Sequence, residues 1–173
     1  DERNLDMFKA TGMLSPDSVC KTFDNAANGY ARSEGCGILI LEKGKPLSEA
    51  YAVVKGSAVN HDGRTATLTA PNGPSQESLY YAALKDANLS TDDIDVIECH
   101  GTGTPLGDPI EVSAIGRVFC EGRENALYLG AVKANVGHLD SAAGIASLIK
   151  VILSLQHKTI PLHRNFSEPN RHI

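Results

Sequence analysis

The sequence predicts an α/β domain in which strands alternate with helices, a pattern typical of layered folds. Two observations predict this class. Short runs of branched apolar residues, bounded by glycine or turn residues, are typical of buried strands. Longer segments carry apolar residues at helical spacing. The chain has 173 residues, of which 42% are hydrophobic, so it is long and apolar enough for one globular domain with a core.

Four segments are predicted to be strands. They are residues 36–42 (CGILILE), 51–59 (YAVVKGSAV), 94–99 (IDVIEC) and 127–133 (LYLGAVK). Each is short and rich in apolar residues, and the first is dominated by branched ones. A polar segment at 60–76, full of turn residues, separates the second strand from the first helix.

Three segments, residues 75–88, 108–119 and 141–157, are predicted to be helices. The second opens on Asp108, which we expect to cap it, and Glu111 stands where a capping box places its acidic residue. The third is apolar on almost every side, so we expect it to be buried between layers. Its narrow polar stripe consists of Ser147, Lys150 and Ser154.

Charge and cysteine content exclude several functional classes. The net charge of −5 argues against a nucleic-acid partner, which needs a basic face. No apolar run approaches the ~20 residues of a membrane span, and the N-terminal residues are too polar for a signal peptide. The sequence therefore predicts a cytoplasmic protein that contacts no membrane. Neither a zinc-type CxxC pair nor a secreted disulfide framework is formed by the four cysteines, Cys20, Cys36, Cys99 and Cys120.

A glycine- and threonine-rich loop connects the third predicted strand to the second helix, in the stretch ECHGTGTPLGDPIE at 98–111. Its glycines are spaced G-x-G-x-x-x-G, which departs from the dinucleotide-binding pattern, and no GK[ST] is present. Phosphate binding is therefore disfavoured. His100 stands at the strand end, where a ring nitrogen can point into a cavity. This loop alone leaves a catalytic and a structural role for His100 equally open.

A second loop has the same design and favours a catalytic role. Residues 133–144 (KANVGHLDSAAG) follow the fourth predicted strand and carry Lys133 and His138 before a small-residue helix start. Ligand sites of α/β sheets lie at the carboxyl ends of strands, so two parallel strands would bring both histidines together. Two neutral imidazoles there can each donate an N–H to one developing oxyanion. A nearby lysine can tune their pKa.

These motifs resemble those of one enzyme family. HGTGTPLGDPIE at 100–111 and VKANVGHLDSAAG at 132–144 resemble the two histidine motifs of β-ketoacyl synthases, in the form found in ketosynthase domains of type I polyketide synthases. Three further segments are similar to other parts of that family, so the resemblance spans nearly all of the chain: CKTFDNAANGYARSEGCG at 20–37, NHDGRTATLTAPNGPSQ at 60–76 and LQHKTIPLHRNFSEPN at 155–170.

The resemblance implies a thiolase-like layered fold and a decarboxylative Claisen condensation of an acyl thioester with malonyl- or methylmalonyl-acyl carrier protein. His100 and His138 would stabilise the thioester enolate, and Lys133 would support the pair electrostatically. Thr102 and Thr104 would bind the phosphopantetheine arm of the acyl carrier protein, the implied partner. The resemblance implies no metal and no directly bound cofactor, and it implies a homodimer for the complete domain.

The family nucleophile, a cysteine in a small-residue segment at a helix N-terminus, has no counterpart here. Cys99 adjoins His100, but adjacent strand residues point to opposite faces, so Cys99 is predicted to be a core residue. Cys20, Cys36 and Cys120 are expected to be structural or incidental, with Cys36 in a buried strand. We therefore expect residues 1–173 to be the C-terminal portion of a single ketosynthase domain, the second half of the fold, with the nucleophile half supplied by another segment or chain.

Two alternatives remain open. The chain could be a non-catalytic ketosynthase-like module that binds acyl carrier protein, or it could support decarboxylation without condensation. Because an uncovered apolar helix promotes aggregation, we do not expect the chain to fold as a solitary monomer, and alone it should not catalyse condensation. Asn135 is expected to brace the second loop. The other histidines are expected to be solvated or capping residues: His61, His157, His163 and His172.

Overall fold

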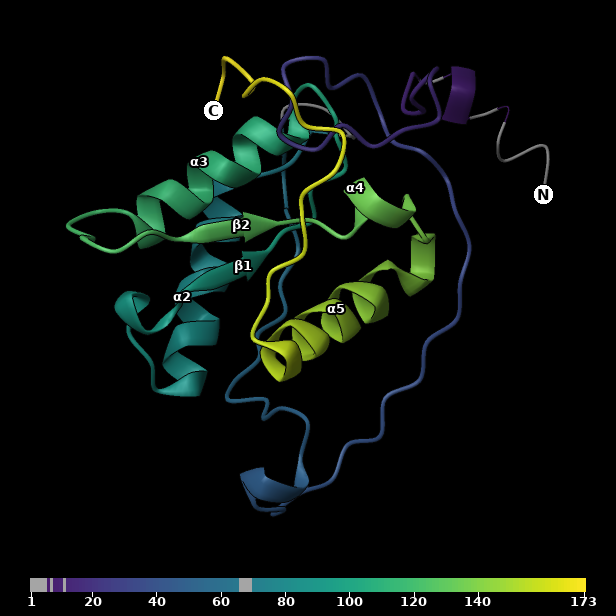
Figure 1. Cartoon of the computed structure of the whole chain (residues 1–173). Coiled ribbons are helices and arrows are strands. Elements are labelled where there is room, and N and C mark those ends of the chain that lie inside the picture. The colour runs from purple at the N-terminus through teal and green to yellow at the C-terminus, as the bar shows by residue number, and fades with distance from the viewer. Residues whose placement is uncertain (1–5, 7, 11, 66–69) are drawn as a thin grey trace.

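The computed structural model describes residues 6, 8–10, 12–65 and 70–173. A two-stranded parallel sheet lies at its centre, with helices on both faces (Figure 1). In chain order the elements are η1 (Leu47–Glu49), α2 (Gly73–Ala87), η2 (Thr91–Asp93), β1 (Val96–Glu98), α3 (Gly107–Phe119), β2 (Tyr128–Gly130), α4 (Lys133–Val136), η3 (Asp140–Ala142) and α5 (Ala143–His157).

The sheet confirms that the third and fourth predicted strands are parallel neighbours. β1 pairs with β2 from Val96↔Tyr128 to Glu98↔Gly130. Because side chains alternate along a strand, Ile97 faces the core while Glu98 faces α5, to whose Lys150 it is bonded. The result is a helix–sheet–helix layering.

The hydrophobic core lies between the sheet, α2 and α3. Its buried members come from α2, α3 and the residue that follows β1. They are Leu84 of α2, Cys99 after β1, and Ile115, Val118 and Phe119 of α3. Asn72 caps α2 by accepting a hydrogen bond from the backbone N–H of Ser75.

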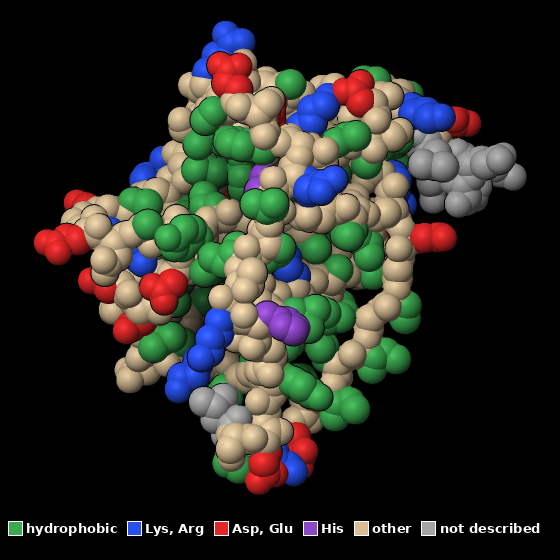
Figure 2. All heavy atoms as spheres, viewed as in Figure 1, with side chains coloured by type: hydrophobic (Ala, Val, Ile, Leu, Met, Phe, Trp, Pro, Cys, Tyr) green, Lys and Arg blue, Asp and Glu red, His purple; other side chains and the backbone are tan. Residues whose placement is uncertain are grey.

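The strands predicted at 36–42 and 51–59 are wrong for this structure. Both segments are extended but carry no assigned strand, because within the described residues no neighbouring strand lies beside them to complete a ladder. Most of their branched side chains are exposed, and Ile40 is 93% accessible. Figure 1 shows segment 36–42 as an unpaired trace outside α5, and Figure 2 shows hydrophobic side chains along it.

The expected burial of the third helix is also wrong here. Ala143 is the buried residue of α5, whereas Leu148 and Leu153 are exposed. The polar stripe faces the sheet, since Lys150 and Ser154 line a cavity together with Glu98. Gly37 lies against Ile145 and Ile149 of α5, while Leu148, Leu153 and Leu155 remain exposed. No helix in the described ranges is long and apolar enough to cross a membrane.

Candidate active site

The two histidines predicted to share a site lie next to each other. His100 comes two residues after β1, and His138 follows α4, beyond the end of β2. Their ring centroids are 5.7 Å apart, and the rings meet edge to face at 86°. Lys133 is the first residue of α4 and is buried. The parallel sheet therefore brings these three side chains to one edge, as the strand-end pattern predicts.

The ring of His138 is held in a defined orientation. Its Nδ1 accepts a hydrogen bond of 3.0 Å from the backbone N–H of Asp140. A neutral imidazole that accepts at Nδ1 carries its proton on Nε2. His138 therefore presents an N–H donor at Nε2, which is the group that an oxyanion requires. Tyr30 packs against the same ring, with centroids 5.1 Å apart.

The backbone of His138 is held by two hydrogen bonds to the segment from Ala31 to Ser33. The N–H of His138 donates to Ala31 O at 2.7 Å, and the N–H of Ser33 donates to His138 O at 2.9 Å. Gly137 ends α4 at φ +79, and a Cβ there would lie 3.1 Å from the Cβ of Ser33. A side chain at residue 137 would therefore be both strained and crowded.

The backbone at His100 is held by a carboxylate. Glu111 Oε1 accepts from the N–H of His100 at 2.6 Å, and its Oε2 accepts from the N–H of Gly101 at 2.9 Å. Asp108 likewise accepts from the N–H groups of Phe23 and Gly103. The predicted capping roles are thus wrong: α3 begins at Gly107 without a side-chain cap from its N-cap residue. Both carboxylates instead satisfy buried N–H groups of the neighbouring loops.

Residues 20–31 pack beneath the Gly–Thr loop. Thr22 Oγ1 donates to Gly101 O at 2.6 Å, and the N–H of Gly29 donates to Gly103 O at 3.0 Å. Gly101 adopts φ +47, and a Cβ there would lie 2.5 Å from the Cβ of Ala131. The loop after His100 can therefore approach the loop after β2 only because residue 101 has no side chain.

The site favours neutral imidazoles. Desolvation by the surrounding protein, together with the charges of Lys133 and His138, lowers the pKa of His100 to about 4, although the residue is exposed to solvent. Burial and the charge of Lys133 also lower the pKa of His138. Burial lowers the pKa of Lys133, while Glu111 and Glu98 oppose that effect. Both rings are therefore neutral near pH 7 and able to donate.

The two threonines lie together in the loop. Thr102 is buried and Thr104 half-buried, and their Oγ1 atoms are 3.4 Å apart. Thr104 Oγ1 also accepts from the N–H of Gly107 at 3.1 Å. Because each hydroxyl has two acceptor lone pairs and a rotatable proton, both retain capacity for a further hydrogen bond.

The cysteines do not have the features of a thiolate nucleophile for this site. Cys99 is confirmed as a core residue, 3% exposed, and burial raises the pKa of its thiol well above the ordinary range. Cys20 is buried, and its Sγ accepts from the N–H of Ala31; burial raises its pKa as well. The prediction that Cys36 lies in a buried strand is wrong, since Cys36 and Cys120 are exposed. Thiolate nucleophiles need a lowered pKa, which Cys99 and Cys20 do not have.

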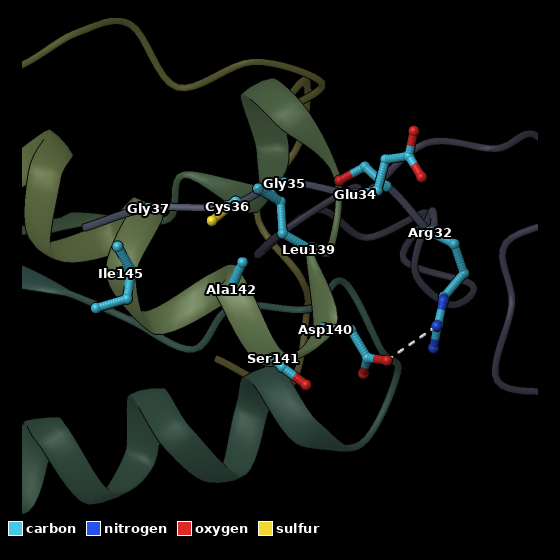
Figure 3. Close-up of a pocket in the computed structure, with 11 residues that line it drawn as sticks. Arg32, Glu34, Gly35, Cys36, Gly37, Leu139, Asp140, Ser141, Ala142 and Ile145 are labelled. Carbon is cyan, nitrogen blue, oxygen red and sulfur yellow. Dashed lines mark hydrogen bonds and ion pairs between the residues drawn. The ribbon is translucent and has the colours of Figure 1, made fainter.

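An open cavity of about 420 Å³ lies between residues 32–37 and the segment that leads into α5 (Figure 3). One wall is the segment from Arg32 to Gly37, and the other is formed by residues 139–142 and Ile145. Arg32 and Asp140 join the walls through an ion pair of 2.9 Å. The cavity begins at Leu139, directly after His138, and the histidine rings do not line it.

Several residues that shape the site escaped sequence reasoning. Glu98, Glu111 and Tyr30 contact its loops or rings. Glu111 and Tyr30 lie in family-like segments, which could have indicated a part in the site, whereas Glu98 lies outside those segments. The expectation that His163 is solvated or capping is wrong: its ring stacks on Phe23 at 5.4 Å, and its Nε2 lies 3.1 Å from Thr22 O. Asn135 donates to Leu162 O at 3.3 Å, so it ties its loop to the C-terminal segment as expected.

Family models identify the chain by its sequence. Residues 51–167 match the model for the β-ketoacyl synthase C-terminal domain, and residues 1–46 match the model for the N-terminal domain. The chain belongs to the β-ketoacyl synthase family. The predicted resemblance to ketosynthases of type I polyketide synthases is thereby confirmed.

Known relatives agree with this assignment. A phenolphthiocerol/phthiocerol polyketide synthase of Mycobacterium tuberculosis is 46% identical over 169 residues, which cover 93% of this chain and 8% of the relative. Polyketide synthase GfsA of Streptomyces halstedii is 45% identical, over 96% of this chain and 2% of its own length. The chain thus spans less than a tenth of these relatives.

Solved structures confirm the thiolase-like α/β class. The ketosynthase from module 6 of the bacillaene synthase of Bacillus subtilis aligns with a TM-score of 0.88 at 37% identity, covering 100% of this chain and 32% of that one. The oxazolomycin ketosynthase domain OzmH KS7 of Streptomyces albus aligns with a TM-score of 0.83 at 33% identity, over 96% of this chain and 30% of that one.

Proposed function

We propose that the chain supplies the histidine half of a β-ketoacyl synthase site, in the C-terminal portion of a single ketosynthase domain. The observation that carries this proposal is the edge-to-face contact of His100 with His138, whose proton is held on Nε2. Two neutral imidazoles at the ends of adjacent strands can donate to one oxygen, and a buried lysine beside them adds positive charge.

The reaction begins with decarboxylation of a malonyl or methylmalonyl thioester on the phosphopantetheine arm of an acyl carrier protein. The bond between the carboxylate and the α carbon breaks, CO₂ leaves, and the electron pair forms an enolate. His100 and His138 donate N–H groups to the enolate oxygen, and Lys133 stabilises the negative charge. Thr102 and Thr104 hydrogen-bond the phosphopantetheine arm. No metal or further cofactor is required for this step.

Condensation needs an acyl group on a thiolate. The enolate carbon attacks the carbonyl carbon of that acyl thioester, a C–C bond forms, and the thiolate leaves. Cys99 and Cys20 are unsuited because burial raises their pKa, so we assign the nucleophile to the partner half of the domain, in the same or another polypeptide. We expect the complete domain to act as a homodimer in the cytoplasm and the isolated chain to be inactive in condensation.

The test is CO₂ release from malonyl carrier protein by the polypeptide that carries this chain. His100→Ala and His138→Ala should each lower the rate about 10²-fold, as expected for loss of one oxyanion donor. His157→Ala, at the exposed end of α5, should leave it unchanged. A wild-type protein that binds carrier protein but releases no CO₂ would identify a non-catalytic module. Release of CO₂ without a condensation product would identify a decarboxylase.

A further inference from the structure

A buried ion pair lies between β1 and α5, on the sheet face opposite the core. Lys150 Nζ lies 2.6 Å from Glu98 Oε2, and their side chains are 15% and 7% exposed. The pair lies directly over Gly130, where a Cβ would be 2.8 Å from Lys150 Nζ. A buried pair is expensive to desolvate unless its remaining hydrogen-bonding groups are satisfied. The second carboxylate oxygen of Glu98 therefore needs a hydrogen-bond donor of its own.

That second oxygen reaches the loop that carries the lysine of the site. Glu98 Oε1 accepts a hydrogen bond of 2.5 Å from the backbone N–H of Val132, the residue before Lys133. One carboxylate thus links three parts of the chain that lie next to site residues in the sequence. β1 ends on Glu98 itself, two residues before His100; α4 begins at Lys133; and α5 follows the segment of His138.

We propose that Glu98 and Lys150 form a positioning pair, which sets the distance of His100 from Lys133 and His138. The inference rests on the proposed function of these three residues. Strand pairing ends at Glu98↔Gly130, with one further bond from the N–H of Cys99 to Gly130 O at 2.7 Å. Beyond that point the two loops contact each other where Gly101 meets Ala131, and Glu98 adds a hydrogen bond from the first strand to the second loop.

The lysine has a defined part in this arrangement. Glu98 is an ordinary flexible side chain, and its ion pair with Lys150 fixes the carboxylate in the orientation that receives Val132. Without Lys150, the buried carboxylate would turn toward solvent or toward the charge of Lys133 and release Val132. Displacement of a catalytic group by about 1 Å can cost about 10²-fold in rate, so a small shift of this loop is measurable.

The test compares Lys150→Met, Lys150→Arg and Glu98→Gln in the polypeptide that carries this chain, by CO₂ release from malonyl carrier protein. Lys150→Met should lower kcat about tenfold with KM within twofold, because the pair orients groups without touching substrate. Lys150→Arg, which keeps the charge, should restore most of the rate. Lys85→Met, at an exposed lysine of α2, should have no effect.

A pH profile separates positioning from plain stability. Glu98→Gln removes a negative charge near Lys133, so the loss of activity at high pH should begin at lower pH than in wild type. Leu129→Ala weakens the core beside the same sheet and should lower the melting temperature with kcat and the pH profile unchanged.

If Lys150→Met does not fold, the double variant Glu98→Gln/Lys150→Met, which leaves no unpaired buried charge, should still show the kcat loss.

The outcomes distinguish this inference from the proposed function. If wild-type protein releases no CO₂, or His138→Ala is as active as wild type, both fail. If His138→Ala is impaired but Lys150→Met matches wild type, the positioning pair alone is refuted. The pair is likewise refuted if Leu129→Ala loses as much kcat as Lys150→Met at equal melting temperature.

Discussion

Asp24 should anchor the C-terminal segment to the floor of the site. Its Oδ2 accepts from the N–H of Ser167 at 2.6 Å, the hydroxyl of Ser167 at 3.0 Å and the N–H of Glu168 at 3.1 Å; its Oδ1 accepts from the N–H of Ala26 at 2.7 Å. Burial alone would raise the pKa of Asp24, but these donors outweigh it and lower the pKa from 3.8 to about 2.

The size of the effect follows from that pKa. At about 1.4 kcal/mol per pH unit, the ionised Asp24 contributes about 2.5 kcal/mol to the stability of this segment. Because the folded-state pKa is depressed, the contribution is complete above the unfolded value of 3.8 and is lost as the pH falls through about 2. Asp24→Asn should remove most of it, since an amide has one acceptor oxygen in place of two.

Hydrogen exchange of residues 163–170 measures this locally, in whatever assembly contains the chain. Asp24→Asn should speed exchange of these amides about 30-fold at pH 7, the factor equivalent to about 2 kcal/mol of opening free energy. The difference from wild type should persist down to about pH 4 and vanish as the pH approaches 2. Asp92→Asn, at an exposed carboxylate of η2, is the control. A change of less than threefold would refute the anchoring role of Asp24.

Three further outcomes are expected. Glu111→Ala should lower the free energy of unfolding by about 2–4 kcal/mol in urea titrations, because it strands the N–H groups of His100 and Gly101; a change equal to that of the exposed Glu121→Ala would contradict this. Since the pKa of His100 is about 4, its ring should stay neutral as the pH falls from 7 to 5. The rate of CO₂ release by His138→Ala should therefore not fall with a pKa near 6.5, and such a fall would contradict the lowered pKa of His100. Residues 1–173 produced alone should self-associate in sedimentation experiments, because Ile40 and Leu153 are exposed, and a monodisperse, cooperatively melting monomer would contradict this.

Local patterns predicted those elements whose partners lie nearby. The segments at 94–99 and 127–133 were identifiable because the sheet that pairs them and the helices that cover them lie within the chain. The segments at 36–42 and 51–59 have equally good strand composition, yet strand formation depends on a neighbour that composition does not reveal. The same limit explains α5, whose apolar surface predicts a covering layer that the described residues do not provide.

The site divides in the same way. Motif spacing predicted the convergence of His100 and His138, because both follow adjacent parallel strands. It could not predict the carboxylates, since Asp108 and Glu111 fit a local capping pattern while their real donors lie in other loops. The ion pair of Glu98 with Lys150 spans 52 positions in the sequence, and local periodicity cannot predict a contact between such distant residues.

The two histidines are restrained by different means, and this has a chemical consequence. His138 has its Nδ1 bonded to the Asp140 N–H, so its donor is oriented before substrate arrives. For His100, the hydrogen bond to Glu111 fixes the backbone, and within the described residues the ring is restrained by its edge contact with His138. A preorganised donor loses less free energy on reaching the transition state than one that must first rotate. In the proposed reaction His138 is therefore the fixed reference for the enolate oxygen, and the position of His100 depends on His138 and on the Glu98–Lys150 pair that holds the two loops together.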